Sequence, residues 1–393
     1  MKWRIALFGS AVTVISSCAA AAPAPTPTPA GSASPGAPGK SWRFVVGGDS
    51  RNCGDVVMPA VAAGAAASGA QLYWHLGDFR AIFDFDEDFL AQPERAGRHV
   101  AIADYERLAW DDFIQSQIVP FAPITVFLAL GNHETTTPKT RADYLQQFAD
   151  WLTAPAIRDQ RLKDDPKDHR LRAYYHWIQG GVDFVTLDNA TPDQFDSEQL
   201  RWFDGVIARA EKNPDVRAIA VGMHAALPDS LAADHSMNDW PQGEKSGRRV
   251  YARLLAARRV KPVYIFASHS HFYMSGIFGT AEKQTAGDDL PGWIVGTTGA
   301  VRYPLPEGAA RAPEKKTDIY GYLVGTVEPE GEKPGTLRLE FREIAEKDIP
   351  AETVKRFGTD FVHRCFEANR RTAAPGSPTP VPVPSATPPA NTR

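Results

Sequence analysis

The feature that most constrains the fold of this chain is a series of short apolar runs that alternate with helix-like segments. The runs are rich in β-branched and aromatic residues and almost continuously hydrophobic, which is typical of strands buried on both faces. They are Trp42–Gly48, Gln71–Gly77, Ile124–Gly131, Val182–Asp188, Arg217–Met223 and Pro262–Ser268. Helices are predicted between them at Val56–Ser68, Tyr105–Ile118 and Ser197–Lys212. Asp196 and Gln199 predict a capping box that opens the last helix.

Three later runs lack long helices between them and therefore predict an antiparallel continuation: Trp293–Thr298, Tyr320–Thr326 and Thr336–Arg342. The whole pattern predicts an α/β fold with two packed sheets flanked by helices. The chain has 393 residues, of which 43% are hydrophobic, so it is long enough to bury a substantial core. Its formal net charge of −4 gives no basic field to attract nucleic acid, and no nucleic-acid partner is expected.

The N-terminus predicts export. Lys2 and Arg4 precede an apolar run that is too short to span a bilayer and is typical of a signal peptide. The run ends in Ile15-Ser16-Ser17-Cys18, which resembles the bacterial lipobox and implies cleavage before Cys18 and lipid attachment to its sulfur. The alternative is ordinary cleavage among residues 19–22, which would remove Cys18. We therefore expect a protein of the bacterial cell envelope, in the periplasm or at the cell surface, tethered to the membrane by lipid.

Composition divides the chain into a signal peptide, a linker, a folded domain and a tail. Residues 1–18 form the predicted signal peptide, and residues 19–40 are rich in Ala, Pro and Thr, as is the tail at residues 372–393. Such segments bury too little apolar surface to offset the entropy of ordering them, so we expect a disordered linker, a folded domain at residues 41–371 and a disordered tail.

Cys53 and Cys365 remain in the domain. An oxidising compartment permits a disulfide between them, but their positions in sequence do not show that they meet.

Polar side chains able to bind metal follow the ends of the predicted strands. In open α/β sheets, ligand sites lie beyond the carboxyl ends of the strands, so successive strand ends deliver their side chains to one edge. In chain order these side chains are Asp49, Asp78, Asn132 with His133, His224, and His269 with His271. Carboxylate, amide and imidazole donors without a thiolate suit Mn, Fe, Zn or Ni better than calcium. The sequence thus predicts a site for one or two divalent or trivalent metal ions.

The set of motifs resembles the calcineurin-like metallophosphoesterase superfamily, which includes the purple acid phosphatases. The resemblance extends over residues 42–273 and rests on Gly48-Asp49, Gly77-Asp78, Gly131-Asn132-His133-Glu134, Gly222-Met223-His224 and His269-Ser270-His271. It implies a four-layer αββα sandwich of two mixed β-sheets flanked by helices. It also implies that Asp78 bridges two metal ions, with the remaining ligands being Asn132, His224 and His269 for one ion and Asp49 and His271 for the other.

The first motif departs from the family pattern. Arg51 stands where the family usually has a histidine, and Ala81 stands where purple acid phosphatases have a tyrosine. One ion is therefore short of a protein ligand. Water, Ser50 or Asn52 could supply it, or that ion could be weakly held. Arg51 could instead clamp a phosphate oxygen with its planar guanidinium, or pair with a carboxylate such as Asp49.

The resemblance implies hydrolysis of a phosphomonoester or phosphodiester by direct attack of a metal-bound hydroxide. His133 would protonate the leaving group, with Glu134 orienting it, and Arg51 would stabilise charge on the phosphate oxygens. The expected substrate is a small-molecule phosphate ester, and neither its identity nor the oligomeric state can be read from the sequence. The alternative is a catalytically degenerate envelope lipoprotein that binds a phosphorylated ligand without turnover. The missing ligand motivates this alternative, and the retained His133 argues against it.

Two polar features beside the motifs are expected to be structural. The acidic run at residues 84–88 is predicted to be a solvated loop, with capping of the site or binding of an extra cation as alternatives. His75 lies on a predicted strand shortly before Asp78. It is expected to be a buried core histidine rather than a partner of a metal ligand.

Overall fold

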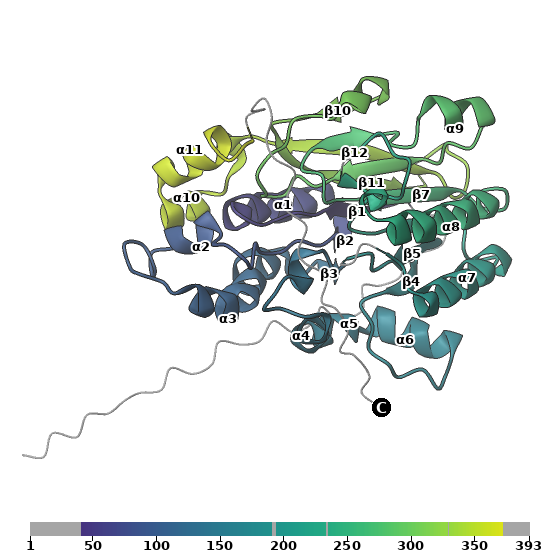
Figure 1. Ribbon diagram of the computed structural model, residues 1–393, viewed down its shortest axis with the longest axis horizontal. Coiled ribbons are helices and arrows are strands. Elements are labelled where there is room, and N and C mark those ends of the chain that lie inside the picture. Colours follow the sequence, from purple (N-terminus) through teal and green to yellow (C-terminus); the bar gives the residue numbers. More distant parts are fainter. Residues whose placement is uncertain (1–40, 191–193, 233–234, 329, 372–393) are drawn as a thin grey trace, which may run out of the picture.

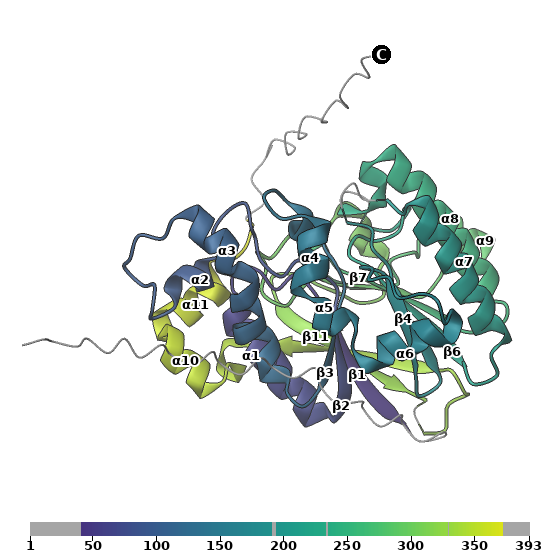
Figure 2. The same cartoon turned by 90° about the horizontal axis from the view of Figure 1, so that it is seen from below.

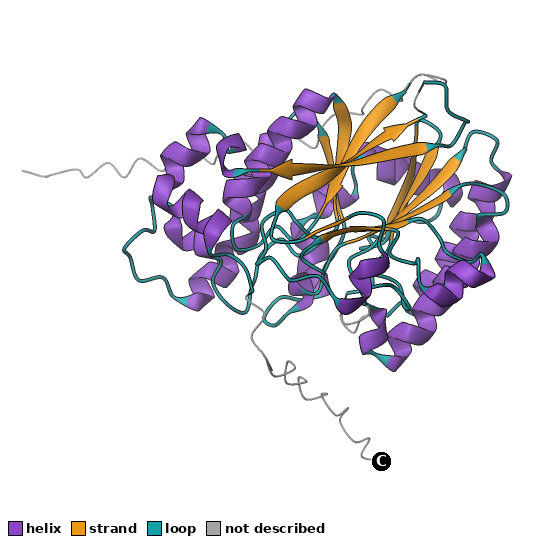
Figure 3. Cartoon of the chain, turned by 90° about the horizontal axis from the view of Figure 1, so that it is seen from above, coloured by secondary structure: helices purple, strands orange, loops and turns teal. Residues whose placement is uncertain are grey.

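The computed structural model describes residues 41–190, 194–232, 235–328 and 330–371. Two mixed β-sheets lie face to face in the middle of the molecule, and helices cover their outer faces (Figures 1 and 3). The predicted αββα sandwich is therefore confirmed. The predicted signal peptide with Cys18, the linker at residues 19–40 and the tail at residues 372–393 lie outside the described residues. Among the described helices, none has the length and apolar character needed to cross a membrane.

The first sheet contains strands from both ends of the domain. Its order is β12-β11-β1-β2-β3, with β1 at Trp42–Gly47, β2 at Ala70–His75, β3 at Thr125–Leu128, β11 at Tyr320–Val327 and β12 at Leu337–Ile344. β1, β2 and β3 are parallel, whereas β11 pairs with β1 and β12 in antiparallel register. The loops after β1, β2 and β3 therefore leave the sheet at the same edge.

The second sheet has the order β10-β8-β9-β7-β6-β5-β4. Its strands are β4 (Tyr175–Gln179), β5 (Val182–Thr186), β6 (Ala218–Gly222), β7 (Val263–Ala267), β8 (Tyr273–Ser275), β9 (Gly292–Val295) and β10 (Lys315–Lys316). β5, β6, β7 and β9 are parallel neighbours, and β4, β8 and β10 are antiparallel additions. The predicted antiparallel continuation is confirmed for β11 and β12, although these strands belong to the first sheet. It is wrong in part for the run at Trp293–Thr298, because β9 lies parallel to β7 and antiparallel only to β8.

Helices cover both outer faces. They are α1 (Gly54–Ser68), α2 (Glu87–Ala91), α3 (Ile102–Phe113), α4 (Arg141–Gln147), α5 (Ala149–Leu152), α6 (Pro155–Asp164), α7 (Ser197–Lys212), α8 (Pro241–Ala257), α9 (Ala281–Ala286), α10 (Ala351–Phe357) and α11 (Thr359–Glu367). α1 packs on the first sheet, and α7 and α8 lie side by side on the second (Figures 1 and 2). Asp196 caps α7 as predicted, but the capping box is incomplete because the Gln199 side chain bonds to the backbone of Asp188 instead.

Aromatic side chains fill the space between the two sheets. Trp74 on β2 is fully buried, and its ring lies 5.5 Å from Trp177, 5.7 Å from Phe184 and 6.1 Å from Phe266 on the opposite sheet, measured between ring centroids. A Cβ atom at Gly222 would lie 2.3 Å from the Trp74 ring, so a side chain there would displace the indole. Because large aromatic rings bury much apolar surface, this layer holds the two sheets together and sets their spacing.

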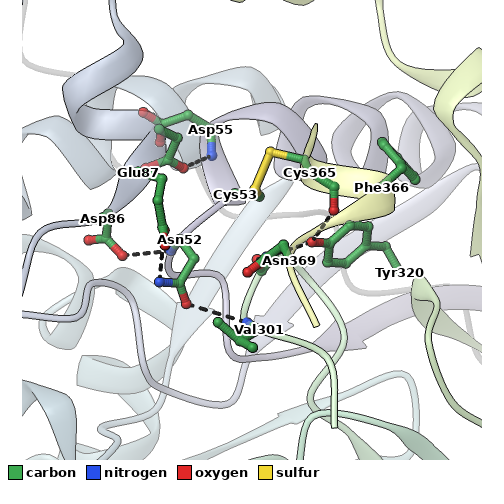
Figure 4. The surroundings of a disulfide bond; sticks show 12 residues. Asn52, Cys53, Asp55, Asp86, Glu87, Val301, Tyr320, Cys365, Phe366 and Asn369 are labelled. Carbon is green, nitrogen blue, oxygen red and sulfur yellow. Dashed lines mark hydrogen bonds between the residues drawn. A yellow bond between two sulfur atoms is a disulfide. The ribbon is translucent and has the colours of Figure 1, made fainter. Parts of the chain in front are cut away.

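A disulfide joins the two ends of the folded domain. Cys53, in the loop after β1, is bonded to Cys365 on α11, and their Cα atoms lie 5.9 Å apart (Figure 4). The bond closes a loop across a sequence separation of 312 residues. It therefore fastens the C-terminal helix pair to the loop that carries the first motif.

The prediction of a solvated loop at residues 84–88 is wrong in part, because Asp86 and Asp88 are fully buried. Arg80, which is also fully buried, lies among them, and its guanidinium is 2.9 Å from Asp88 Oδ1 and 2.5 Å from Asp112 Oδ2. Buried charges persist where opposite charges and hydrogen bonds compensate them. Carboxylates from several segments meet around one arginine, and this is a tertiary arrangement that the local run of acids does not reveal.

Replacing Cys365 by alanine is expected to lower the free energy of unfolding by about 2–5 kcal/mol, because the unfolded chain would no longer be constrained by a long closed loop. Urea titration of the oxidised wild type and the variant would measure this difference. Dithiothreitol should shift the wild-type midpoint toward that of Cys365→Ala and leave the variant unchanged. An unchanged midpoint in both cases would show that the bond adds no stability.

His176 is expected to make stability depend on pH. Its Nδ1 lies 2.8 Å from Asp183 Oδ1 and its Nε2 lies 2.7 Å from Asp164 Oδ2. Burial lowers the pKa of His176, but the two carboxylates outweigh burial and raise the pKa to about 9. Because the folded pKa lies above the ordinary value of about 6.5, this contribution is complete below pH about 6.5 and is lost as the pH rises through about 9.

The difference in unfolding free energy between the wild type and His176→Gln should therefore shrink by about 3 kcal/mol across this pH window. Urea titrations of both proteins between pH 6 and pH 10 would measure it. A difference that stays constant with pH would contradict a charged His176 in the native state.

Candidate metal centre

The structure brings all the predicted site residues together at the edge where the loops after the parallel strands of both sheets meet. Asp49, Asp78 and His269 follow β1, β2 and β7, and their φ angles are 58°, 61° and 67°. Residues with a side chain rarely adopt this left-handed region, and such strain persists where the surrounding structure holds it. Gly77, at φ 96°, precedes Asp78, and a Cβ atom there would lie 2.5 Å from the backbone nitrogen of Gly131. The backbone is thus turned sharply where the donors project.

Asp78, His224 and His269 form a candidate metal site, because one donor atom of each lies within 4.8 Å of the others. His224 Nε2 is 3.0 Å from His269 Nδ1, 3.3 Å from Asp78 Oδ1 and 2.9 Å from Asn132 Oδ1. The other ring nitrogen of His224 lies 2.9 Å from the Leu76 carbonyl oxygen and must donate to it. The ring is therefore fixed with Nε2 directed at the other donors.

The charge on these groups fits a bound cation. Burial lowers the pKa of His224, but Asp78 outweighs it and raises the pKa to about 10, so a proton is held at Nε2 in the metal-free protein. Metal ions compete with protons for such ligands. Asp78 Oδ2 is buried and accepts no hydrogen bond within the described residues. A buried carboxylate oxygen without a partner is unfavourable, and a metal ion would satisfy it.

Asp49 and His271 form a second pair of donors. Asp49 Oδ1 lies 3.1 Å from His271 Nε2, while Asp49 Oδ2 accepts hydrogen bonds from the Ser268 hydroxyl and, at 2.7 Å, from the His269 backbone N–H. Burial raises the pKa of Asp49, but the neighbouring His271 and His224 outweigh burial and keep that pKa well below its usual range. His271 Nδ1 lies 2.6 Å from the Val301 carbonyl oxygen, which orients the ring in the same way as His224.

Arg51 lies beside the second pair. Its Nη2 is 3.1 Å from His271 Nε2, and its Nε is 3.7 Å from Asp78 Oδ2. The arginine therefore pairs with Asp78, as the alternative of a nearby carboxylate allowed, rather than with Asp49, the carboxylate named as its example. Its side chain is only 13% exposed, and its Nε has no hydrogen-bond partner among the described residues. The carboxylate of Asp78, with lesser contributions from its neighbours, outweighs burial and raises the pKa of Arg51, which remains charged.

Neither side chain considered as a replacement ligand is free to take that role. The Ser50 hydroxyl lies 2.9 Å from His75 Nε2, and the Asn52 amide donates to Glu87 Oε2 at 3.0 Å. His75 is fully buried, as predicted, yet its contact with Ser50 also links it to the first motif. The ligand that the family histidine would supply is therefore replaced by neither Ser50 nor Asn52 in this conformation.

His133 is positioned by a backbone carbonyl. Its Nδ1 lies 2.7 Å from the Ala81 oxygen, and its Nε2 lies 3.6 Å from Asp78 Oδ2. Burial and the neighbouring Arg51 cation lower the pKa of His133 to about 4. Nδ1 therefore carries a proton that it donates to Ala81, and Nε2 is the atom that faces the centre.

The prediction that Glu134 orients His133 is wrong. The buried Glu134 carboxylate accepts backbone N–H groups from Asp78, Phe79 and Gly131, each at 2.8 Å. It thereby ties the loop after β2 to the loop after β3. The position of a glutamate after a histidine in sequence gives no indication of this role, because the amides it binds belong mainly to another loop.

A cavity of about 570 Å³ lies away from this centre, near α6, β4 and α7. It is lined by charged and aromatic side chains that include Arg161, Asp168, Tyr174 and Trp202. None of the predicted donors lines it. The chemistry implied by the motifs therefore belongs to the strand-end centre and not to this cavity.

Comparison with known proteins identifies the family. A profile described as calcineurin-like phosphoesterase matches residues 52–273, which is more than half of the chain. The chain belongs to this family. Membership supports a metal-dependent phosphoester hydrolase in general and agrees with the candidate site. The matched region begins just after Arg51, so the divergent first motif lies outside it.

Solved structures with similar folds include several phosphatases. A purple acid phosphatase from yellow lupin (Lupinus luteus) seeds is 18% identical over 78% of this chain and 52% of its own, with a TM-score of 0.49. PhoD is 12% identical over 85% and 78%, with a TM-score of 0.49. A dimetal phosphatase from Danio rerio is 11% identical over 77% and 95%, with a TM-score of 0.47. No curated protein sequence matches the chain.

Replacing Glu134 by alanine is expected to destabilise the protein by about 3 kcal/mol or more, because three buried amides would lose their acceptor. Glu134→Gln keeps one acceptor oxygen and should lose less. Urea unfolding of both variants, with a metal titration of each, would test this role. Wild-type midpoints and metal affinity in Glu134→Ala would show that the tie between the two loops is dispensable.

Proposed function

We propose that this chain hydrolyses a phosphomonoester or phosphodiester by direct attack of water, without a covalent phosphoenzyme. The observation that supports this most strongly is the convergence of Asp78, His224 and His269 beside His133, with a buried Asp78 oxygen that accepts no hydrogen bond in the part of the chain that the structure describes. The chemistry of these donors suits a divalent ion of the Mn, Fe, Zn or Ni type, and the family is one of metal-dependent phosphoesterases.

Asp78, Asn132, His224 and His269 would hold the ion. When bound, such an ion lowers the pKa of water and stabilises negative charge on phosphate oxygens. The carbonyl of Leu76 fixes the His224 ring, so this ligand keeps its orientation whether or not the ion is present. The loops after β2, β3 and β7 hold the other three ligands, Asp78, Asn132 and His269, in position.

His133 is proposed to give a proton to the leaving-group oxygen through Nε2, because Nδ1 is occupied by the Ala81 carbonyl. The negative charge of a bound phosphate favours the protonated ring. Phe83, which is 61% exposed, has its ring centroid 5.2 Å from that of His133 and offers an apolar surface to the leaving group. An aryl phosphate is therefore a suitable probe.

Arg51 is proposed to stabilise the phosphate oxygens. Its Nε makes no hydrogen bond among the described residues, and a guanidinium N–H binds a phosphate oxygen well. Because Nη2 is directed at His271, the group is held in place before the substrate arrives.

The site of action is proposed to be the bacterial cell envelope, with a small-molecule phosphate ester as substrate and a lipid at Cys18 as the tether. The lipobox-like Ile15-Ser16-Ser17-Cys18 motivates the tether. The disulfide between Cys53 and Cys365 supports an exported protein, since such bonds persist in oxidising compartments.

Wild-type protein supplied with Mn²⁺ is expected to hydrolyse aryl phosphates, and His133→Asn should lower kcat by about 10²–10⁴ for a poor leaving group such as phenol. The loss should be smaller for p-nitrophenol, because that leaving group needs little protonation. Steady-state kinetics on monoesters and diesters of both phenols would measure the difference. His99→Asn, at an exposed position, is the matched control.

Asp78→Asn serves as the inactive reference and should lose about 10²-fold or more. Equal losses for phenol and p-nitrophenol in His133→Asn would remove the proton-donor role. A metal-loaded wild type that binds phosphate but hydrolyses neither ester class would instead favour the non-catalytic, ligand-binding lipoprotein.

A further inference from the structure

The guanidinium of Arg51 lies where the resemblance to the family would place a second metal ion. The three donors of that position are Asp49 Oδ1, His271 Nε2 and Asp78 Oδ2, while the other oxygen of Asp78 lies 3.3 Å from His224 Nε2 in the candidate site. Arg51 Nη2 is 3.1 Å from His271 Nε2, and Arg51 Nε is 3.7 Å from Asp78 Oδ2. Asp49 Oδ1 is 3.1 Å from the same His271 nitrogen. The positive group is therefore bordered by the donors that a cation would use.

We propose that the Arg51 guanidinium replaces one metal ion of the pair, so that the chain works with a single exchangeable metal ion beside a built-in cation. This rests on the proposed function in one respect, namely that Asp78, His224 and His269 hold the remaining ion. The arginine supplies positive charge beside Asp49 and Asp78 that chelators cannot remove. A guanidinium also keeps its proton across the physiological pH range.

His271 has one ring nitrogen, Nε2, that can accept a bond, and Arg51 Nη2 lies beside it. Its Nδ1 lies 2.6 Å from the Val301 carbonyl oxygen and must be the protonated nitrogen, which leaves a single lone pair at Nε2. That lone pair faces Arg51 Nη2 at 3.1 Å and Asp49 Oδ1 at 3.1 Å, and of these two groups only the guanidinium carries an N–H to donate. The His271 ring stacks on Tyr303 with centroids 4.0 Å apart, so the packing opposes a rotation that would present another atom. A metal ion and Arg51 therefore compete for the same lone pair.

The backbone on both sides of Arg51 is fixed. The Ser50 N–H donates to the Asp78 carbonyl at 3.0 Å, and the Asn52 N–H donates to Asp86 Oδ1 at 2.6 Å. Cys53 follows, and it is bonded to Cys365 of α11 (Figure 4). The Cα atom of Arg51 thus cannot withdraw from the centre by a simple movement of its loop.

The side chains on either side of Arg51 bond to other residues, so Arg51 is the side chain of this segment that is directed at the site. The Asn52 amide donates to Glu87 Oε2 at 3.0 Å, and its oxygen accepts the Val301 N–H at 3.4 Å, as Figure 4 shows. The Ser50 hydroxyl faces His75. Neither can complete a second metal shell while these contacts persist, and displacing Arg51 would leave a site with few protein ligands.

A metal count tests the proposal directly. Protein stripped with a chelator would be titrated with Mn²⁺ by calorimetry, and electron paramagnetic resonance would separate isolated ions from a coupled pair. The wild type should bind about one ion per chain with an isolated-ion spectrum. Arg51→His removes the cation and restores an imidazole donor, so it should bind about two ions and give a coupled spectrum. Arg107→His, at an exposed position, should stay at about one.

Two ions of similar affinity in the wild type, or a coupled spectrum, would overturn the proposal. A folded Arg51→His protein that remains at one ion would do the same. If this variant does not fold, the wild-type count still decides the question. Hydrolysis of phenyl phosphate is measured on the same samples. In the wild type, absence of turnover with a single bound ion would count against the proposed function alone, and turnover with two bound ions would count against the Arg51 proposal alone.

Discussion

The geometry of the candidate metal centre depends on one buried carboxylate, that of Glu134. Glu134 accepts the amides of Asp78, Phe79 and Gly131, and so it holds the loops after β2 and β3 at a fixed distance. Asp78 has a positive φ and a buried carboxylate oxygen that accepts no hydrogen bond from the described residues, so its backbone needs such support. If this tie is absent, the loops can relax and the donors separate. The strain at Asp78 is thus stabilised by hydrogen bonds that lie outside the reacting groups.

The need to compensate buried negative charge explains why positive groups lie beside Asp49 and Asp78. Asp49 and Asp78 are fully buried, and buried carboxylates are stable only beside compensating positive charge. In the metal-free protein, His224 supplies one such charge and Arg51 supplies another. The positive charge on His224 can be exchanged for a metal ion, because it is carried by a proton on the imidazole ring. The second is covalently part of the chain, and the disulfide at Cys53 keeps its loop in place.

Much of the architecture could be predicted from the sequence, because buried parallel strands are continuous hydrophobic runs. The helix Ser197–Lys212 has the predicted bounds, whereas β3 at Thr125–Leu128 is shorter than the run Ile124–Gly131 because its end turns into the donor loop. The solvated loop at residues 84–88 was wrong in part, since its burial depends on Arg80 and on carboxylates from other segments. The predicted capping-box hydrogen bond from the Gln199 side chain was also wrong, because the Gln199 amide donates to the backbone carbonyl of Asp188 instead.

The sequence by itself determined the family motifs, the order of donors and the α/β class, because these follow from residue type and spacing along single strands. The tertiary structure alone decided that Cys53 meets Cys365, that Glu134 binds the loop amides, and that Arg51 is directed at His271 and Asp78. The physical reason is the same in each case. These contacts join segments far apart in the chain, and their geometry is set by how the two sheets pack rather than by any local pattern.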